Sequence, residues 1–439
     1  MSSVFSENLK IYNAEQFRTS ISDPGQPNIY LTIGRVAPWD NDLEPPQADS
    51  SVSSFNDVWH QMIAAKLITG GDVRHGIRRI NWEENKVYDQ YDHRTGSILY
   101  DSSQFYVLTT DWNIYKCLSN AMGSISTVMP TQTITDSAVE EQDGYIWKYM
   151  YSLTAEERIR FMTDDHIPVR TLSVDNNTLQ WRVQDEAIAG SIDIIRVDDV
   201  GSGYTNANSI SVTITGDGTG ATARAKINST SNTVSAITLI NRGAGYTTAT
   251  VSISGTGTGA NASIVVPPPG GHGSDALREL GGSYLILNPR IKSTEGGKIS
   301  INNEYRQIAI IQSPIVVGTG NAASNTVYSQ VLRLTVSPGA ISFNEDEYVY
   351  QGESLATADF KGLVVDFDTS NNILQLTDTF GDVTSTILLG ANSGAARFIE
   401  SITEKELRLY SGSLLYIDQI VPIERAADQT EDYKIVLKF

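Results

Sequence analysis

The sequence predicts a β-rich α+β protein, in which a discontinuous mixed core domain carries two inserted all-β domains. Segments rich in aromatic and β-branched residues, Phe105 to Leu118 and Tyr145 to Leu153, favour strands in the core. Two copies of one glycine-punctuated strand pattern fill residues 191–266. Several short apolar segments separated by turn residues fill residues 320–400. The core segments that remain are residues 1–190, 267–319 and 401–439.

Helical spacing in the first core segment predicts one clear helix. The apolar residues at this spacing are Phe55, Val58, Trp59, Met62, Ile63 and Leu67. Ser54 is placed as an N-cap, and Gly70-Gly71 would end the helix. Trp59 is interpreted as a packing anchor, because such a stripe usually faces the core. Thr154-Ala-Glu-Glu157 matches a capping box and predicts a second, shorter helix.

The first insert, residues 191–266, is predicted to be a tandem glycine-rich hairpin repeat. Gly201-Ser-Gly-Tyr-Thr205 recurs as Gly243-Ala-Gly-Tyr-Thr247, and an alternating strand follows each copy. Gly216-Asp-Gly-Thr-Gly-Ala221 and Gly255-Thr-Gly-Thr-Gly-Ala260 then close the copies. Period-two alternation between glycine turns predicts β-hairpins. Pro267 to Gly271 is interpreted as a stiff linker.

The second insert, residues 320–400, is predicted to be a small β-barrel or sandwich. Its strand candidates are Val331–Val336, Tyr348–Gln351, Gly362–Phe367, Ile373–Leu376 and Thr386–Leu389. Strands this short need one another to bury an apolar core. The final residues, Tyr433 to Phe439, alternate like a strand and are expected to be tied into a sheet.

Charge and cysteine content restrict the classes of partner and compartment. The net charge of −19 disfavours nucleic acid and anionic membrane surfaces as partners. The single cysteine, Cys117, lies in an apolar strand pattern and is interpreted as a core residue, and one cysteine cannot form an intrachain disulfide. The N-terminus lacks a signal-peptide pattern and no apolar run is long enough to span a membrane, so we expect neither secretion nor membrane insertion.

The motifs predict no catalytic, cofactor-binding or metal site, and no small-molecule substrate. The glycine-rich loops lack the lysine and the following helix of a phosphate-binding loop. The five histidines are scattered without zinc-ligand spacing. Gly270 to Leu277 matches one copy of a calcium-binding nonapeptide, which needs stacked copies, and we favour a linker into a short capped helix.

Three groups of residues are interface candidates. Arg78 and Arg79, near Trp82, suit either a structural ion pair or a contact with a neighbouring subunit. Tyr204 and Tyr246 could be stacking surfaces for a glycan, or could pack at the turns between repeats. The third group is either a polar turn or an interface and comprises Asp428, Gln429, Thr430 and Glu431.

A series of short matches in order resembles one family. Leu31-Thr-Ile-Gly-Arg35 with Pro38-Trp39, and the near-terminal Asp428 to Glu431, are the most informative. Between them lie Phe17-Arg-Thr19, Trp59 with Met62, Ile77 to Arg79 before Trp82, Asp143 to Trp147, and Arg306 to Ile311 before Pro314. Together they resemble the baseplate wedge subunit of T-even-type contractile-tailed phages, the gene-eight product family. The resemblance covers residues 1–190, about 275–315 and 405–439.

The resemblance implies a structural subunit of a contractile tail baseplate, without enzymatic activity. It implies a homodimer that binds other wedge proteins and takes part in the baseplate shape change. The expected location is the virion, after assembly in the host cytoplasm. The alternative function is a receptor-binding or glycan-binding tail component. A tail-associated hydrolase is a third class, and the sequence offers no acid/base pair for it.

Overall fold

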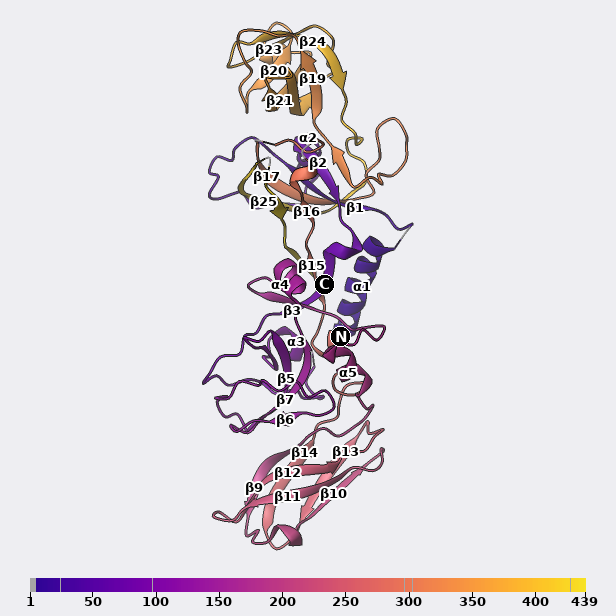
Figure 1. The fold of residues 1–439 in the computed structure, drawn as a ribbon, viewed down its shortest axis with the longest axis vertical. Coiled ribbons are helices and arrows are strands. Elements are labelled where there is room, and N and C mark those ends of the chain that lie inside the picture. Colours follow the sequence, from indigo (N-terminus) through magenta and orange to yellow (C-terminus); the bar gives the residue numbers. More distant parts are fainter. Residues whose placement is uncertain (1–4, 24, 97, 296, 302, 427) are drawn as a thin grey trace. The chain divides into compact units, whose positions relative to one another are not determined.

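A computed structural model describes residues 5–23, 25–96, 98–295, 297–301, 303–426 and 428–439 (Figure 1). The chain divides into two compact units. Unit 1 comprises the described residues of Met1–Gln16, Arg74–Leu287 and Ile435–Phe439, and unit 2 comprises those of Phe17–Val73 and Asn288–Lys434. The expected core segments contribute to both units.

Unit 2 contains a five-stranded antiparallel sheet built from distant segments. Its order is β18 (Val327–Ser329), β2 (Met62–Leu67), β1 (Ile29–Gly34), β17 (Asn303–Gln312) and β25 (Ser413–Arg425). Helix α2 (Val52–Gln61) packs on this sheet through Val58 and Trp59, which share a buried cluster with Tyr30 and Met62. A short pair, β16 (Arg290–Ile291) and β26 (Glu431–Asp432), also belongs to unit 2.

The prediction of one helix from Phe55 to Leu67 is wrong in its second half. Helix α2 begins after Ser51, whose hydroxyl accepts a hydrogen bond from the Ser54 amide at 3.1 Å, and it ends at Gln61. Residues Met62–Leu67 form β2 instead, paired on both sides by β1 and β18. A short continuous apolar run suits a buried strand as well as a helix, and periodicity alone cannot separate the two. Trp59 is fully buried, as its interpretation as a packing anchor requires.

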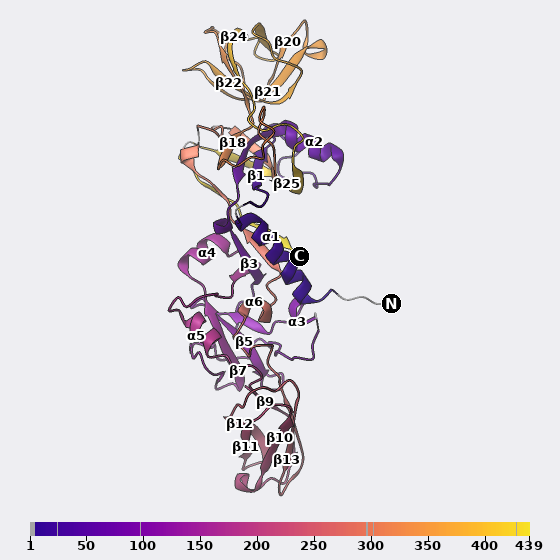
Figure 2. The same cartoon turned by 90° about the vertical axis from the view of Figure 1, so that its right-hand side faces the viewer.

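Residues 332–403 of unit 2 form a closed six-stranded barrel (Figure 2). The order is β19 (Leu332–Val336), β22 (Ile373–Phe380), β21 (Phe360–Asp368), β20 (Tyr348–Gln351), β23 (Ile387–Gly390) and β24 (Ala396–Thr403). The barrel has its own apolar cluster, which includes Leu334, Val349, Leu374 and Ile399. The prediction of a small barrel or sandwich is confirmed as a barrel. The closing strand β24 extends past the expected boundary at residue 400.

Unit 1 contains two four-stranded sheets and short helices. One sheet has the order β27 (Ile435–Lys438), β15 (Tyr284–Leu287), β3 (Val73–Arg78) and β8 (His166–Val169). The other has the order β4 (Tyr106–Leu108), β5 (Asn113–Asn120), β7 (Tyr145–Ser152) and β6 (Val139–Glu140). The C-terminal strand is thus tied into a sheet, as predicted.

The helices outside α2 are α1 (Glu7–Ser22), α3 (Ile98–Asp101), α4 (Ala155–Phe161), α5 (Leu179–Asp185) and α6 (Ala276–Glu279). In the described residues, 3₁₀ turns cover Gly70–Asp72, Ala207–Ser209, Ser293–Glu295 and Leu355–Thr357. The predicted capping box of α4 is confirmed, because the Glu157 amide donates to the Thr154 hydroxyl at 3.2 Å and the Thr154 amide donates to the Glu157 carboxylate at 3.0 Å. The interpretation of Gly270 to Leu277 is confirmed in its capped helix, α6, whose Asp275 carboxylate accepts from the Arg278 amide at 3.1 Å.

The first insert is a six-stranded module in which the two sequence copies interlock. Copy 1 supplies β9 (Ile195–Ser202), β10 (Ser211–Gly216) and β11 (Thr222–Asn228), and copy 2 supplies β12 (Thr233–Asn241), β13 (Ala249–Ser254) and β14 (Thr258–Ile264). The pairs are β9 with β14, β10 with β13 and β11 with β12. Every pair therefore joins one copy to the other, and the prediction of a hairpin within each copy is wrong.

Reciprocal contacts between the copies explain both glycine motifs. The Tyr204 ring of copy 1 covers Gly257 of copy 2, and the Tyr246 ring of copy 2 covers Gly218 of copy 1. A Cβ atom at either glycine would overlap the ring that covers it. The module also has its own apolar cluster, which includes both tyrosines, Ile195 and Val234. Each copy alone lacks the ring and the strand partners that the other supplies.

Gly218→Ala and Gly257→Ala are each expected to destabilise the module by about 1–3 kcal/mol, because the added methyl group must displace a buried tyrosine ring. Chemical denaturation followed by tyrosine fluorescence measures the change. Gly96→Ala is the control, because a Cβ atom at Gly96 has open space around it. Equal effects at all three positions would contradict the role assigned to the two rings.

Candidate interface and anchoring sites

Two of the family-like motifs meet on neighbouring strands of unit 2. Leu31 on β1 lies opposite Ile310 on β17, and Ile33 lies opposite Ile308. The polar ends of these motifs form a group that we call the Arg306 cluster, made of Arg35, Trp39, Asp42 and Arg306. The sequence motifs are therefore neighbours in the fold, although they are separated by more than 260 residues along the chain.

The Arg306 cluster is organised by one nearly buried guanidinium. Arg306 donates to both carboxylate oxygens of Asp42, at 2.8 and 2.9 Å, and to the Val36 carbonyl at 2.5 Å. Hydrogen bonds from Arg306, and then from the Trp39 amide, lower the pKa of Asp42. The guanidinium of Arg35 stacks over the half-buried Trp39 ring, 3.6 Å from its centroid. This ordered, partly exposed Arg–Trp pair has the composition of interface hot spots.

The predicted basic pair, Arg78 and Arg79, contacts backbone carbonyls of unit 1. Arg78 donates to the Ser103 carbonyl at 2.6 Å, and Arg79 donates to the Thr163 carbonyl at 3.1 Å. The Trp82 indole donates to the Ser126 hydroxyl at 3.2 Å and packs against the apolar core of unit 1. The structure thus gives these three side chains intramolecular partners, and their role in an interface stays a prediction.

The near-terminal motif is split between surface and interior. Asp428, Gln429 and Thr430 are exposed, whereas Glu431 is buried and pairs with the fully buried Arg425. Burial raises the pKa of Glu431, although the Arg425 charge opposes that shift. Arg425 also donates to the Ser300 carbonyl at 3.1 Å. Glu431 is therefore a structural residue of unit 2, and the first three residues remain available for contacts.

Tyr204 and Tyr246 are buried, with 2% and 5% of their surface exposed. Their rings cover glycines of the opposite copy, and the Tyr246 hydroxyl accepts a hydrogen bond from the Ala221 amide at 3.3 Å. Neither ring presents a face on which a sugar could stack.

A buried charged group in unit 1 was missed by sequence reasoning. The Lys116 ammonium lies 2.8 Å from the Glu279 carboxylate and 3.0 Å from Nδ1 of His272, and all three side chains are almost completely buried. Lys116 also lies 3.9 Å from the Tyr91 ring centroid. Burial opposes ionisation of Glu279, yet the neighbouring Lys116 and His272 hold its pKa down to about 2.

The Lys116 group fixes the segment after the first insert. Glu279 also accepts from the Gly273 amide at 2.7 Å, so the 270–280 segment is fastened to β5 of the core sheet. Burial, and then the Lys116 charge, lower the pKa of His272, which leaves a neutral imidazole that accepts from Lys116 at Nδ1. The linker predicted for Gly270 to Leu277 is therefore a packed segment, in which His272 is buried. The available signal was Lys116 itself, a lone charge within the apolar strand Ile114 to Leu118.

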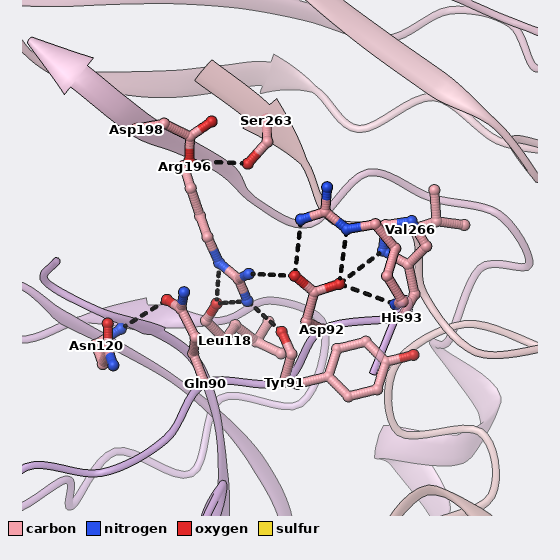
Figure 3. Close-up of polar contacts among 11 residues, drawn as sticks. Gln90, Tyr91, Asp92, His93, Leu118, Asn120, Arg196, Asp198, Ser263 and Val266 are labelled. Carbon is pink, nitrogen blue, oxygen red and sulfur yellow. Dashed lines mark hydrogen bonds and ion pairs between the residues drawn. The ribbon is translucent and has the colours of Figure 1, made fainter. Parts of the chain in front are cut away.

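A second anchoring group holds the module at its entry strand (Figure 3). Arg196 on β9 is 7% exposed and extends from the module to the core segment around residues 90–94. Its guanidinium donates to the Leu118 carbonyl at 2.7 and 3.0 Å and to the Tyr91 carbonyl, and it lies 3.6 Å from the Asp92 carboxylate. Hydrogen bonds from Arg94, together with the Arg94 and Arg196 charges, lower the pKa of Asp92 to about 2. Burial opposes this shift.

The exit of the module is tied to the same core segment. The Val266 amide donates to Nδ1 of His93 at 3.3 Å, next to Asp92. Near the middle of the module's sequence, Arg242 donates to Asp193 at 2.9 Å and to the Asp136 carbonyl of the core at 2.5 Å. The module is thus fixed to unit 1 at its entry, at its exit and at a third point.

Acidification is expected to loosen the exit contact. Burial lowers the pKa of His93, against the nearby Asp92, while Arg94 and Arg196 add to the lowering. The neutral ring therefore stabilises the fold fully above the unfolded pKa of about 6.5, and this contribution is lost as pH falls through the lower folded pKa. Protonated Nδ1 cannot accept the Val266 N–H bond. Hydrogen exchange at Val266, corrected for intrinsic rates, should accelerate between about pH 7.5 and about pH 5.

The Tyr246 amide is the control for this measurement, because it donates to the Gly190 carbonyl at 3.0 Å and its acceptor does not titrate. Similar acceleration at both amides would show general loosening and would contradict the role assigned to His93.

Within the described ranges, no group of three or more His, Cys, Asp or Glu side chains could hold a metal ion. None of the helices in the described part of the chain has the length and apolar character of a membrane span. Cys117 is fully buried, and burial raises the pKa of its thiol far above the ordinary value.

Comparison with known proteins supports the family that the motifs indicate. A family model described as Bacteriophage T4, Gp8 matches residues 3–127. The baseplate wedge protein gp8 of Enterobacteria phage T4 is 24% identical over 181 residues, which cover 34% of this chain and 54% of that protein. The chain therefore spans about half the length of that relative.

The matched segment is structurally central to both units. It contains β1 and β2 of the five-stranded sheet and helix α2 of unit 2, and it contains β3, β4 and β5 of unit 1. Arg35, Trp39 and Asp42 of the Arg306 cluster lie within it. Over residues 3–127, the chain is similar to the gene-eight family of phage baseplate wedge proteins.

Proposed function

We propose that this chain is a structural subunit of a contractile phage tail baseplate wedge, located in the virion tail. The observation that carries the proposal is the family match, together with the T4 baseplate wedge relative. The matched segment builds the sheets of both units, so the resemblance lies in the framework of the protein rather than in a peripheral loop. The work of such a subunit is binding, and we propose no catalytic activity for it.

We further propose that the chain forms a homodimer, binds neighbouring wedge proteins and takes part in the baseplate shape change. Assembly interfaces of this class bury large areas and need rigid surfaces. The Arg306 cluster supplies an Arg–Trp pair, and residues 428–430 supply an exposed segment that carries the acid Asp428. With a net charge of −19, the neighbours best suited to this chain present basic patches.

Both inserts are suited to adding contact surface to this framework. The first insert and the barrel each have their own apolar cluster, so each can fold around its own core. The first insert is also fastened by Arg196, His93 and Arg242, which lets it transmit force to unit 1. Removal of residues 191–266 should leave a folded remainder.

The alternative function, glycan or receptor binding, loses the two residues on which it was based. Tyr204 and Tyr246 are buried against glycines, and the structure offers no other observation that favours this function over assembly.

Light scattering of the purified chain, alone and mixed with the other baseplate proteins of its virion, tests the proposal. We expect twice the monomer mass for the chain alone and a larger defined complex in the mixture. A monomer that stays separate from every other baseplate protein would contradict it.

Asp428→Lys is expected to weaken binding to wedge neighbours about tenfold. The substitution replaces an exposed negative charge with a positive charge, which would repel a basic partner. The unfolding midpoint should stay unchanged, since surface substitutions cost little stability. Surface plasmon resonance against the captured partner measures the affinity. Glu353→Lys, at an exposed acid of the barrel segment, is the charge-matched control. Equal losses from both variants would assign the effect to net charge instead of to this segment.

A further inference from the structure

A cavity of about 500 Å³ lies within unit 2, where the barrel meets the segment that leaves it. The barrel side is lined by Leu332, Phe360, Thr379, Gly381, Asp382 and Val383. The other side is lined by Val317, Glu404, Lys405, Leu407, Arg408 and Leu409. A volume of this size accommodates a small organic molecule or one or two side chains of a partner. Apolar and polar groups contribute equally to the wall.

Lys405 is the unusual residue of this wall. Its Nζ atom is buried, and it has no hydrogen-bond partner among the described residues. Burial lowers the pKa of Lys405 to about 8, against the attraction of Asp378 and Glu404. The Asp378 carboxylate accepts the Tyr348 hydroxyl at 2.6 Å and forms no hydrogen bond with Lys405 among the described residues.

Two lysines with buried side chains, among the described residues, show how such an ammonium group is held elsewhere in the fold. Lys116 is paired with Glu279 at 2.8 Å, and Lys148 donates to the Thr135 carbonyl at 2.6 Å. A buried amine without an acceptor is unfavourable, and native folds keep such groups where a ligand or a functional role compensates for the cost. Lys405 therefore differs from both in having a cavity beside it instead of an acceptor.

We propose that this cavity binds a carboxylate carried on a short apolar body, with Lys405 as the charged contact. The leucine, valine and phenylalanine side chains of the wall match the apolar body. Arg408 adds a second positive charge to the wall and Asp382 and Glu404 add two negative charges, so the buried, unpartnered Nζ of Lys405 is the feature that selects a carboxylate. A free aliphatic acid and the C-terminal residue of a neighbouring polypeptide share this chemistry. Binding of a small carboxylate can be tested without any baseplate partner, so failure of this proposal and failure of the proposed function are distinguishable.

Titration of the full-length chain with hexanoate, followed by ligand-observed NMR, tests the proposal. We expect saturable binding of hexanoate and at least tenfold weaker binding of hexanol, which has the same apolar body without the charge. Acetyl-leucine compared with its amide provides the polypeptide-terminus arm, and tighter binding of acetyl-leucine than of hexanoate would identify a chain terminus as the source. Equal binding of acid and alcohol would overturn the proposal.

Lys405→Met keeps the length of the side chain and removes its charge, so hexanoate binding should fall at least tenfold. Lys226→Met, at an exposed lysine of the first insert, is the matched control and should bind normally. Protection of wild-type Lys405 from acetic anhydride by hexanoate, mapped by peptide mass spectrometry, gives a readout that does not depend on folding of a variant. Unchanged labelling of Lys405 at saturating hexanoate would contradict the proposal.

Discussion

Lys116→Met is expected to lower the free energy of unfolding of the chain by about 3–5 kcal/mol, because it leaves the Glu279 carboxylate buried without its ammonium partner. Glu279 would keep His272 at 3.8 Å and its backbone donors, of which the Gly273 amide is the closest. The lost contact also frees the 270–280 segment from β5. Urea denaturation of unit 1, followed by tryptophan fluorescence, measures the change.

Two further variants separate the ion pair from simple packing. Lys226→Met removes an exposed lysine and should change stability by less than about 0.5 kcal/mol. Lys116→Met combined with Glu279→Leu removes both charges and should recover much of the loss, since a buried pair replaced by apolar groups is often tolerated. A loss below about 1 kcal/mol for Lys116→Met alone would show that this group does not hold the segment.

Arg196→Met is expected to cost about 2–3 kcal/mol and to release the base of the first insert. The substitution leaves the Leu118 and Tyr91 carbonyls without their charged donor in a buried position. We expect faster hydrogen exchange and proteolysis at residues 191–194 and 265–271, while the core of the module stays protected. Protection inside the module should persist because its own apolar cluster does not include Arg196.

Arg224→Met is the matched control for this experiment, because Arg224 is an exposed arginine on β11 of the same module. It should leave exchange at the base of the module unchanged. If Arg196→Met behaved like Arg224→Met, the module would be held by its other contacts, and the anchoring role of Arg196 would be wrong.

The sequence predicts local structure well where one signal is unambiguous. The barrel was predictable because turn residues divide residues 331–389 into segments too short for helices, and the capping box at Thr154 identifies the start of α4. The end of α2 was not predictable, because the apolar run Met62 to Ala65 fits a helix and a buried strand equally well.

The sequence alone did not predict which distant segments contact one another. The repeat at residues 191–266 was visible, but alternation cannot show whether a strand pairs within its own copy or with the other one. The Arg306 cluster was visible only as separate motifs, since Asp42 and Arg306 become neighbours through the pairing of β1 with β17. The pairing of Lys116 with Glu279 was likewise not predictable, because the two residues are 163 positions apart in the sequence.

Pairing of strands across the copies has a mechanical consequence. Because each copy supplies the partner strands and tyrosine ring of the other, the module is expected to unfold as one unit rather than copy by copy. Together with the three attachment points, this makes the insert a stiff extension of unit 1. In the proposed baseplate role, a stiff extension of this kind would transmit force to unit 1.

Quantitative mass spectrometry of purified virion tails tests the central claim most directly. We predict that this chain is present in stoichiometric amount with the other wedge proteins of the baseplate, and that it remains after washing at high salt. Absence of the chain from purified tails, or recovery only in trace amounts, would contradict its assignment as a structural baseplate subunit.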